Sequence, residues 1–267
     1  MNRKIAMPTF DLTGKTAIIT GGTKGLGYGI AATFAHFGAN TVITARTAAD
    51  VDAAAENINH HYIVGKNTCI GIPADSAKRE DIAKVVEKTT GTFGRIDILV
   101  NNAGISGKTA NILTDECSEE NFETVVNTNL KGVFLFAKAV AGQMAAQKTG
   151  GRIINIASVG GLIGGKGLVA YGASKAGVIS LTKTMANEFA RYGVTVNAIC
   201  PGYVVTPLNE AIFLDEDVRK KMESRTALRR LGSIEEIAGP ALALASDSFG
   251  YMTGTYILLD GGQTIGG

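Results

Sequence analysis

A tyrosine and a lysine four residues apart could act together as an acid–base pair in this chain. Tyr171 and Lys175 lie in a stretch with helical spacing that continues through Leu181, Met185 and Phe189. At positions i and i+4 the two side chains would lie one above the other on the same helix face. An ammonium near a phenol favours the phenolate and moves its pKa from about 10 toward the range of a general acid or base. Such a pair also occurs by chance on helix surfaces, so its meaning depends on its neighbours.

A glycine-rich loop near the N-terminus has the composition of a phosphate-binding turn. Residues 20–27 read TGGTKGLG and lead directly into a helical pattern around Ile30. Glycines let the backbone approach a pyrophosphate closely, and the N–H groups of a helix N-terminus meet its charge. We predict a dinucleotide site here, although an ordinary strand–helix turn could have a similar sequence. The contacting residues would be Gly21, Thr23, Lys24, Gly25, Leu26 and Gly27.

The end of the second apolar run, 40–45, indicates which dinucleotide would bind. An acidic residue usually stands there and holds the adenosine ribose hydroxyls, but this chain has Ala45 followed by Arg46. Arg46 and Lys24 could bind a 2′-phosphate, the first as a bidentate fork and the second as a point charge. Alternatively, both are solvated surface cations. We predict that NADP(H) is preferred to NAD(H).

Two further apolar runs are followed by residues that could contact the same cofactor. Asp75 could accept a hydrogen bond from an adenine amino group, or it could cap a helix beginning near Ser76. Asn102, Ala103 and Gly104 form a tight turn after the fourth run. Ligands of a parallel α/β sheet bind at the carboxyl ends of its strands, so these residues become candidate contacts.

The elements that must position these residues alternate along the chain. Seven short runs rich in Ile and Val are separated by stretches with helical spacing: 16–20, 40–45, 68–73, 96–101, 152–158, 194–199 and 255–260. Near-continuous apolar runs of this length are typical of strands covered on both faces. We predict a single α/β domain at 11–267 after a tail at 1–10. Its fold would be a Rossmann fold, with a doubly wound, seven-stranded parallel sheet and helices on both faces.

The motifs occur together and in a characteristic order. The glycine loop, NNAG at 101–104, Ser158 at the end of the fifth run and Tyr-x-x-x-Lys follow one another in one chain. In this combination the sequence resembles the short-chain dehydrogenase/reductase family, in its single-domain form, from Phe10 to Gly262. The resemblance implies an NAD(P)-dependent enzyme that interconverts a secondary alcohol and a ketone.

The resemblance also implies a role for each site residue. Tyr171 would be the general acid or base, and Ser158 would hydrogen-bond the same substrate oxygen. Lys175 would lower the pKa of Tyr171 and reach the nicotinamide ribose, while Asn129 would hold a water that links Lys175 to solvent. After the sixth run, Pro201 and Gly202 would shape the nicotinamide pocket and Thr206 could bind its carboxamide. Val204 would be a further cofactor contact.

Substrate specificity would come from loops. We expect a lid at about 203–228, although a rigid surface hairpin fits the same pattern. The glycine-rich stretch 159–167 would border the substrate. The sequence most resembles family members that act on sugar acids, ketoses and polyols, such as gluconate 5-dehydrogenase. It also resembles 3-oxoacyl carrier-protein reductases and hydroxysteroid dehydrogenases. The alternative from a different class is a non-catalytic NADP-binding sensor or interaction protein.

Composition excludes several other classes of protein. Lys and Arg number 26 against 24 Asp and Glu, a balance that argues against nucleic acid or an anionic membrane as the main partner. Three widely spaced cysteines indicate neither a disulfide framework nor a metal site. We expect a cytoplasmic enzyme acting on a small-molecule ketone or alcohol. By resemblance it would be a homotetramer, with interfaces on helices 121–147 and 171–192 and at the C-terminal end.

Overall fold

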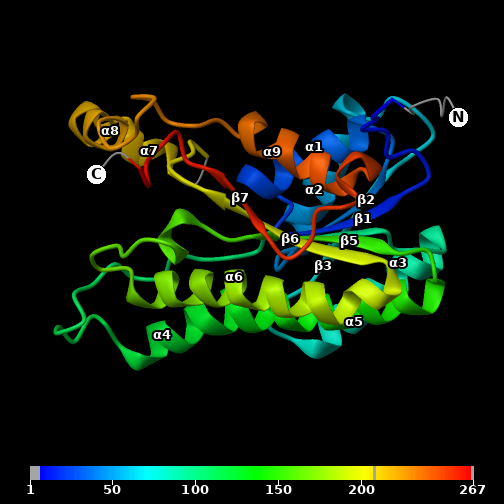
Figure 1. The fold of residues 1–267 in the computed structure, drawn as a ribbon, viewed down its shortest axis with the longest axis horizontal. Helices are drawn as coiled ribbons and strands as arrows, with labels where there is room; N and C mark the ends of the chain where they lie inside the picture. Colours follow the sequence, from blue (N-terminus) through cyan, green and yellow to red (C-terminus); the bar gives the residue numbers. More distant parts are fainter. Residues whose placement is uncertain (1–6, 207–208, 266–267) are drawn as a thin grey trace, which may run out of the picture.

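A seven-stranded parallel sheet forms the centre of the molecule (Figure 1). The computed structural model describes residues 7–206 and 209–265, without the side chains of residues 211 and 212. The strands are β1 (Thr16–Thr20), β2 (Asn40–Ala45), β3 (Cys69–Pro73), β4 (Ile98–Asn101), β5 (Gly151–Ile156), β6 (Val194–Pro201) and β7 (Tyr256–Leu259). Their order is β3-β2-β1-β4-β5-β6-β7. The order reverses between β1 and β4, which is where a doubly wound sheet binds its ligand.

Helices cover both faces of this sheet, as predicted. The helices are α1 (Gly25–His36), α2 (Ala48–His61), α3 (Arg79–Phe93), α4 (Glu119–Val126), α5 (Gly132–Gln147), α6 (Val169–Phe189), α7 (Glu210–Phe213), α8 (Glu216–Glu223) and α9 (Glu235–Ala245). One buried cluster joins the sheet to α1, α2 and α9, and a second joins it to α3, α5 and α6. Figure 1 shows these helices in separate layers above and below the strands.

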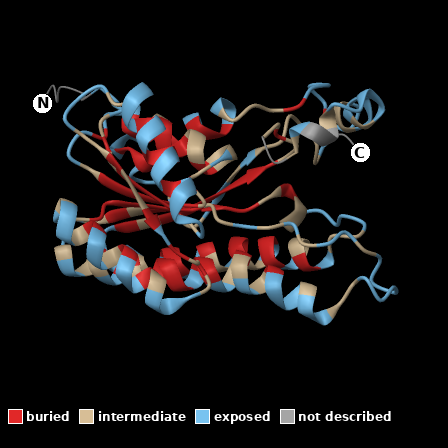
Figure 2. Cartoon of the chain, turned by 180° about the vertical axis from the view of Figure 1, so that it is seen from behind, coloured by how far each residue is buried: buried red, intermediate tan, exposed pale blue. Residues whose placement is uncertain are grey.

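The composition of the strands explains why two layers form. All five residues of β1 are buried. Two of them that are adjacent in sequence, Ile18 and Ile19, belong to the clusters on opposite faces of the sheet. Successive side chains of a strand point to opposite faces, so a strand that is apolar throughout must be covered on both. Buried residues accordingly line the sheet and the inner sides of the helices (Figure 2). The Ile- and Val-rich runs therefore correctly predicted the fold.

Several predicted boundaries are wrong by a few residues. The fifth strand ends at Ile156, and Ser158 instead caps a 3₁₀-helix at Val159–Gly161. The helix expected near Ser76 begins only at Arg79. A π-helix at Asn127–Lys131 separates α4 from α5, where one helix over 121–147 was expected. Neither proline nor glycine interrupts residues 127–131, so composition gave no sign of it.

The predicted tail and lid lie only in part within the described residues. Residues 1–6 of the tail and 207–208 of the lid fall outside them. The main chain of Thr9 makes two hydrogen bonds with the hydroxyl of Ser248, at 3.0 and 2.7 Å, which joins the end of the predicted tail to the segment after α9. Within 7–206 and 209–265, no helix combines the length and the apolar character needed to cross a membrane.

Candidate active site

The first two turns of α6 place Tyr171 and Lys175 beside Ser158. The Ser158 hydroxyl accepts a hydrogen bond from the Gly160 N–H at 3.0 Å, which fixes it at the start of the 3₁₀-helix. A Cβ atom on Gly160 would lie 3.3 Å from Cε1 of Tyr171 and 3.5 Å from Oγ of Ser158. The absence of a side chain at Gly160 thus lets the phenol and the hydroxyl approach each other.

Burial governs the protonation of both α6 residues. It raises the pKa of the Tyr171 phenol, while a hydrogen bond with Ser158 lowers that pKa by a smaller amount. It also lowers the pKa of Lys175 from 10.5 to about 8. In each case the charged form is disfavoured because it has lost its contact with water. The pKa of Tyr171 is therefore raised, whereas the effect of Lys175 alone was expected to lower it.

The position of the lysine nitrogen explains this difference. Nζ of Lys175 donates to the carbonyl oxygen of Ile156 at 2.7 Å and lies 5.7 Å from the centre of the Tyr171 ring. The ammonium is thus held by the end of β5, beside the phenol ring. A Cβ atom on Gly104 would be only 3.6 Å from the same nitrogen, so Gly104 lies next to Lys175 as a candidate cofactor contact.

Asn129 joins the catalytic helix to the loop after β4. It is fully buried in the π-helix, and its Oδ1 accepts from the Ile105 N–H at 2.8 Å. Its Nδ2 donates to the Ile105 carbonyl at 2.8 Å and to the Ser174 hydroxyl at 3.1 Å. Ser174 in turn donates to the carbonyl of Tyr171 at 2.7 Å. Both amide protons of Asn129 therefore hold neighbouring elements in place, and the water expected there stays a prediction.

The glycine loop is packed against the turn after β4. Gly21 has φ +64°, and a Cβ atom on it would lie 3.0 Å from Cα of Ala103. A Cβ atom on Gly27 would lie 2.2 Å from the Gly21 carbonyl oxygen. The amide of Asn102 donates to the Thr20 carbonyl at 2.9 Å and to the Gly21 carbonyl at 3.0 Å. Side chains are thus sterically excluded from the loop, and Asn102 contributes both of its amide protons to hold it.

Sequence reasoning missed the residue that completes this contact. The Thr20 hydroxyl accepts hydrogen bonds from the backbone N–H groups of Asn102 and Ala103, both at 3.0 Å. Thr20 therefore connects β1 to β4 at the point where the sheet reverses its order. A hydroxyl residue directly before the glycines was the available signal.

The start of α1 suits the phosphates of an NAD(P) cofactor. Within the described part of the chain no side chain caps this helix, and its first turn contains no acidic residue. Its first N–H groups therefore lack an intrahelical or side-chain acceptor, as an anion-binding helix end requires. Gly25, with φ +58°, keeps the approach open, because a Cβ atom there would meet only the Thr206 side chain, at 3.6 and 3.7 Å. Thr23 and Leu26 are half-buried in the same turn.

The two predicted phosphate-binding cations are exposed. Lys24 is the N-cap residue of α1, and Arg46 directly follows β2. Neither makes a salt bridge with a carboxylate in the described part of the chain. Asp75 accepts from the Ala77 N–H at 2.9 Å and so closes a turn directly before Lys78, the N-cap of α3. Its predicted contact with adenine stays a prediction.

The end of β6 lies level with Ser158. The parallel register pairs Ile156 with Ile199, so two residues further along Ser158 comes opposite Pro201. Pro201 and Val204 are buried, whereas Gly202 and Thr206 are half-buried. A Cβ atom on Gly202 would be 2.8 Å from Cα of Asp260, so the backbone there passes close to the segment after β7.

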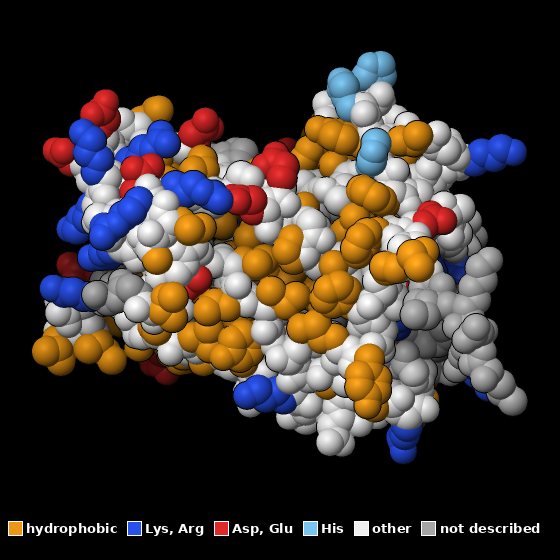
Figure 3. Space-filling model, turned by 45° about the horizontal axis from the view of Figure 1, so that its top comes forward, with side chains coloured by type: hydrophobic (Ala, Val, Ile, Leu, Met, Phe, Trp, Pro, Cys, Tyr) orange, Lys and Arg blue, Asp and Glu red, His pale blue; other side chains and the backbone are white. Residues whose placement is uncertain are grey.

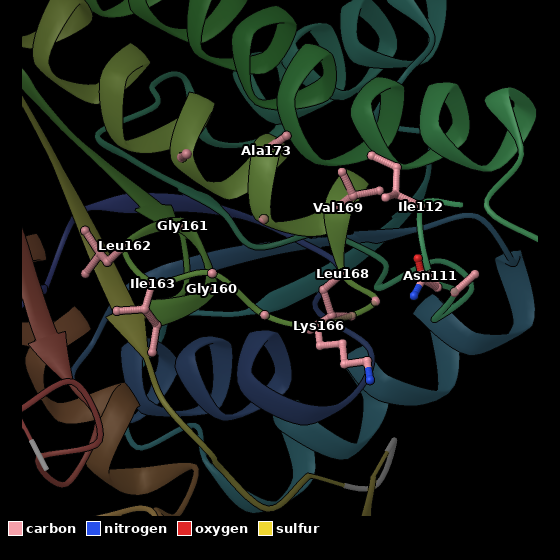
Figure 4. A pocket seen from close by; sticks show the side chains of 16 residues that line it. Asn111, Ile112, Gly160, Gly161, Leu162, Ile163, Lys166, Leu168, Val169 and Ala173 are labelled. Atoms are coloured by element: carbon pink, nitrogen blue, oxygen red, sulfur yellow. The ribbon is translucent and has the colours of Figure 1, made fainter. Parts of the chain in front are cut away.

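A pocket of about 540 Å³ borders the glycine-rich loop that follows Ser158 (Figure 4). Loop residues 160–169 line it together with Gly172, Ala173 and Ala176 of α6 and residues 110–112. Gly160 belongs both to this lining and to the contact between Ser158 and Tyr171. The loop thus lies between the candidate catalytic side chains and a mostly apolar hollow. No group of three or more potential metal ligands occurs within 7–206 and 209–265.

Comparisons with known proteins show the family of this chain. Residues 21–264 match the family described as Enoyl-(Acyl carrier protein) reductase. The chain is 39% identical to 2-dehydro-3-deoxy-D-gluconate 5-dehydrogenase from Dickeya dadantii, covering 95% of this chain and 97% of that protein. The chain belongs to the short-chain dehydrogenase/reductase family. It is an oxidoreductase of that family, whose members use NAD(P)(H).

Two further proteins show the same likeness over nearly the whole chain. The identity is 41% to 3-oxoacyl-[acyl-carrier-protein] reductase FabG from Thermotoga maritima, over 95% of this chain and 99% of that protein. The crystal structure of a short-chain type dehydrogenase/reductase from Mycobacterium marinum has a TM-score of 0.88 and 37% identity. It covers 96% of this chain and 98% of that one. The predicted family and fold are confirmed.

Proposed function

We propose that this protein interconverts a secondary alcohol and a ketone, with Tyr171 as the general acid and base. The observation that carries this proposal is the convergence of the Tyr171 phenol and the Ser158 hydroxyl around Gly160, with Lys175 behind them. When bound, a reduced nicotinamide supplies the hydride. Tyr171 then donates its proton to the substrate oxygen, and Ser158 hydrogen-bonds that oxygen where negative charge develops. Reversal of these proton movements serves alcohol oxidation.

The test is the variant Tyr171→Phe, which removes the proton donor and keeps the ring. We expect kcat to fall by at least about 10²-fold, the usual contribution of a positioned acid or base. Cofactor affinity and the far-UV spectrum should change little. The matched control is Tyr251→Phe, because Tyr251 is exposed and outside the site. Near-normal turnover of Tyr171→Phe would show that another group transfers the proton.

We propose that NADP(H) is the preferred cofactor. Arg46 and Lys24 lie beyond the ends of β2 and β1, two neighbouring strands, and Ala45 offers no carboxylate to the ribose. We expect Arg46→Ala to reduce kcat/KM for NADPH about tenfold or more and to leave that for NADH nearly unchanged, because only NADPH carries the 2′-phosphate. Lys66→Ala is the control, as Lys66 is exposed beyond the opposite end of the sheet. A wild type that prefers NADH would contradict the assignment.

We propose a sugar acid, or a related ketose or polyol, as the substrate. Arg225 lies 3.5 Å from the hydroxyl of Tyr203, which follows the nicotinamide-pocket residues Pro201 and Gly202. Three nearby cations form salt bridges with carboxylates: Arg219, Lys220 and Arg230. Arg225 forms no salt bridge within the described chain. Charged side chains of both signs gather at the end of the molecule that carries α8 (Figure 3). An unpaired guanidinium there supports a substrate with a carboxylate.

Rates on a panel of substrates test this choice. Sugar acids should react faster than the matching neutral polyols, and Arg225→Met should remove that preference and leave the polyol rate unchanged. The principal alternative is reduction of 3-oxoacyl thioesters, which the 41% identity to FabG favours. Hydroxysteroids complete the panel. If NADPH binds but no ketone is reduced, the non-catalytic sensor is the better description.

We also propose that four chains assemble into a tetramer. Phe134 on α5 and Val169 on α6 are exposed apolar residues on the two helices expected to pack on a second copy. Ala137 and Ala141 of α5 are buried in the chain's own core, so they do not contribute to such an interface. The larger side chains on the outer faces of these helices support the interface instead.

A further inference from the structure

The side chain of Asn209 determines whether the hydroxyl of Thr206, in the candidate cofactor site, donates or accepts a hydrogen bond. Thr206 and Asn209 stand three residues apart in the segment between β6 and α7. Oδ1 of Asn209 accepts from the Thr206 N–H at 2.7 Å and lies 3.1 Å from the Thr206 hydroxyl oxygen. Nδ2 of Asn209 donates to the carbonyl of Val204 at 2.9 Å. The asparagine thus closes this segment on itself with three hydrogen bonds.

These contacts determine which atom of the amide is which. A backbone N–H can only donate and a backbone carbonyl can only accept, so the atom facing the Thr206 N–H must be the amide oxygen. The atom facing the Val204 carbonyl must be the amide nitrogen, for the same reason. The amide oxygen accepts only, so the Thr206 hydroxyl must donate its proton to Asn209. Its lone pairs then remain free, and toward any ligand Thr206 Oγ1 acts as an acceptor.

Thr206 lies where the cofactor would pass. Among the described residues, its side chain alone comes within 4 Å of a Cβ atom built on Gly25, at the start of α1. It is half-buried and follows Gly202 by four residues. Phosphate oxygens at this place can only accept, so they cannot satisfy an acceptor. The group of an NAD(P) cofactor that donates from a planar amide is the NH₂ of its nicotinamide carboxamide.

We propose that Asn209 is a positioning residue that holds the Thr206 hydroxyl as an acceptor, so that it selects the NH₂ group of the carboxamide. The inference rests on the proposed function, since it takes the ligand to be an NAD(P) cofactor. Without Asn209 the hydroxyl would rotate freely and could donate as well as accept. The site would then no longer distinguish an amide from a group of the same shape that cannot donate.

The experiment compares NADP⁺ with its 3-acetylpyridine analogue, in which a methyl group replaces the carboxamide NH₂. Dissociation constants are measured by titration calorimetry without substrate, so turnover plays no part. We expect the wild type to bind NADP⁺ about five to tenfold more tightly than the analogue, as for one lost hydrogen bond. The ratio should fall toward one in Asn209→Ala and in Thr206→Val. Asn209→Asp keeps an acceptor for the hydroxyl and should keep the ratio, even if both affinities fall.

Glu210→Gln is the matched control, because Glu210 is exposed on the same turn. A wild-type ratio near one, or an unchanged ratio in Asn209→Ala with both ligands still bound, would overturn the inference. If Asn209→Ala does not fold, Thr206→Val and Asn209→Asp make the same comparison. Failure of the wild type to bind either dinucleotide would instead reject the proposed function itself.

Discussion

The pKa of Tyr171 is raised and that of Lys175 is lowered, and both shifts have the same physical cause. Lys175 is buried and Tyr171 is half-buried, and this loss of hydration makes the phenol resist losing a proton and the ammonium resist keeping one. In the protein without cofactor, both side chains therefore favour their neutral forms more than a tyrosine or a lysine on the surface would. Spacing on a helix predicted that the two side chains would meet, but it could not predict how deeply they would be buried.

The buried lysine should make stability depend on pH in a definite direction. The pKa of Lys175 is about 8 in the folded chain and 10.5 in the reference state, so the unfolded chain binds more protons between these values. The free energy of unfolding contributed by Lys175 therefore rises with pH through this window, by up to about 3 kcal/mol. Below pH 8 the penalty for the buried charge is fully present.

Urea unfolding of Lys175→Met without cofactor measures this contribution. Relative to the wild type, the variant should be most stabilised near pH 7, and the difference should shrink as pH rises toward 9. Taking the difference between the two proteins cancels the titration of Cys69, whose thiol pKa burial raises to about 11. Cys200, whose thiol pKa burial also raises to about 11, interacts with Lys175, so the comparison is made at pH 9 and below, where this thiol stays protonated. A difference that does not vary with pH would mean that the lysine is neutral or solvated throughout.

At the scale of elements, the contact between β1 and β4 is what shapes the cofactor loop. The Thr20 hydroxyl accepts two backbone N–H groups from the turn after β4. Replacing Thr20 with valine keeps the shape of the side chain but leaves the N–H groups of Asn102 and Ala103 without their acceptor. This should lower the free energy of unfolding by about 1–3 kcal/mol. Cofactor affinity should fall with it, because the glycine loop loses its support.

Thr44 provides a close control for this prediction. It pairs with Thr20 across the β1–β2 register and is equally buried, but its hydroxyl has no hydrogen-bond partner among the described residues. Thr44→Val should therefore be neutral or slightly stabilising, since it removes an unsatisfied polar atom. Chemical denaturation of both variants makes the comparison. Equal losses would indicate that the threonine side chains act through packing alone.

Individual residues show where sequence reasoning succeeded and where it stopped. Ile and Val runs predicted the strands because apolar periodicity reports burial directly. The position of Ser158, two residues beyond its strand, depends on a capping hydrogen bond to Gly160 that no local pattern encodes. Thr20 acts through hydrogen bonds with Asn102 and Ala103, and Asn209 through hydrogen bonds with Thr206 and Val204. Only the folded structure brings these partners together. Composition alone does not reveal such contacts. Spacing predicted Tyr171 and Lys175 as candidates, and the family resemblance added Ser158 and Asn129.

At the scale of the whole molecule, the outer faces of α5 and α6 leave large apolar side chains uncovered. Light scattering should give a mass near four times the 27.7 kDa of one chain. Phe134→Glu places a charge on this surface and should lower the mass to that of a dimer or monomer, because burying an unpaired carboxylate is costly. Phe37→Glu, at the C-terminal end of α1 on the other face of the sheet, serves as a comparison because Phe37 is also exposed. A monomeric wild type would refute the assembly.

The π-helix makes chain length itself a structural variable. Each residue of an α-helix turns the chain by about 100°, so the wide turn at Asn127–Lys131 offsets α4 from α5 by the angle of one added residue. Deleting one residue there would restore ordinary winding and rotate every side chain of α4 away from its contacts. Substitutions at exposed positions of this segment should thus be far better tolerated than a change in its length.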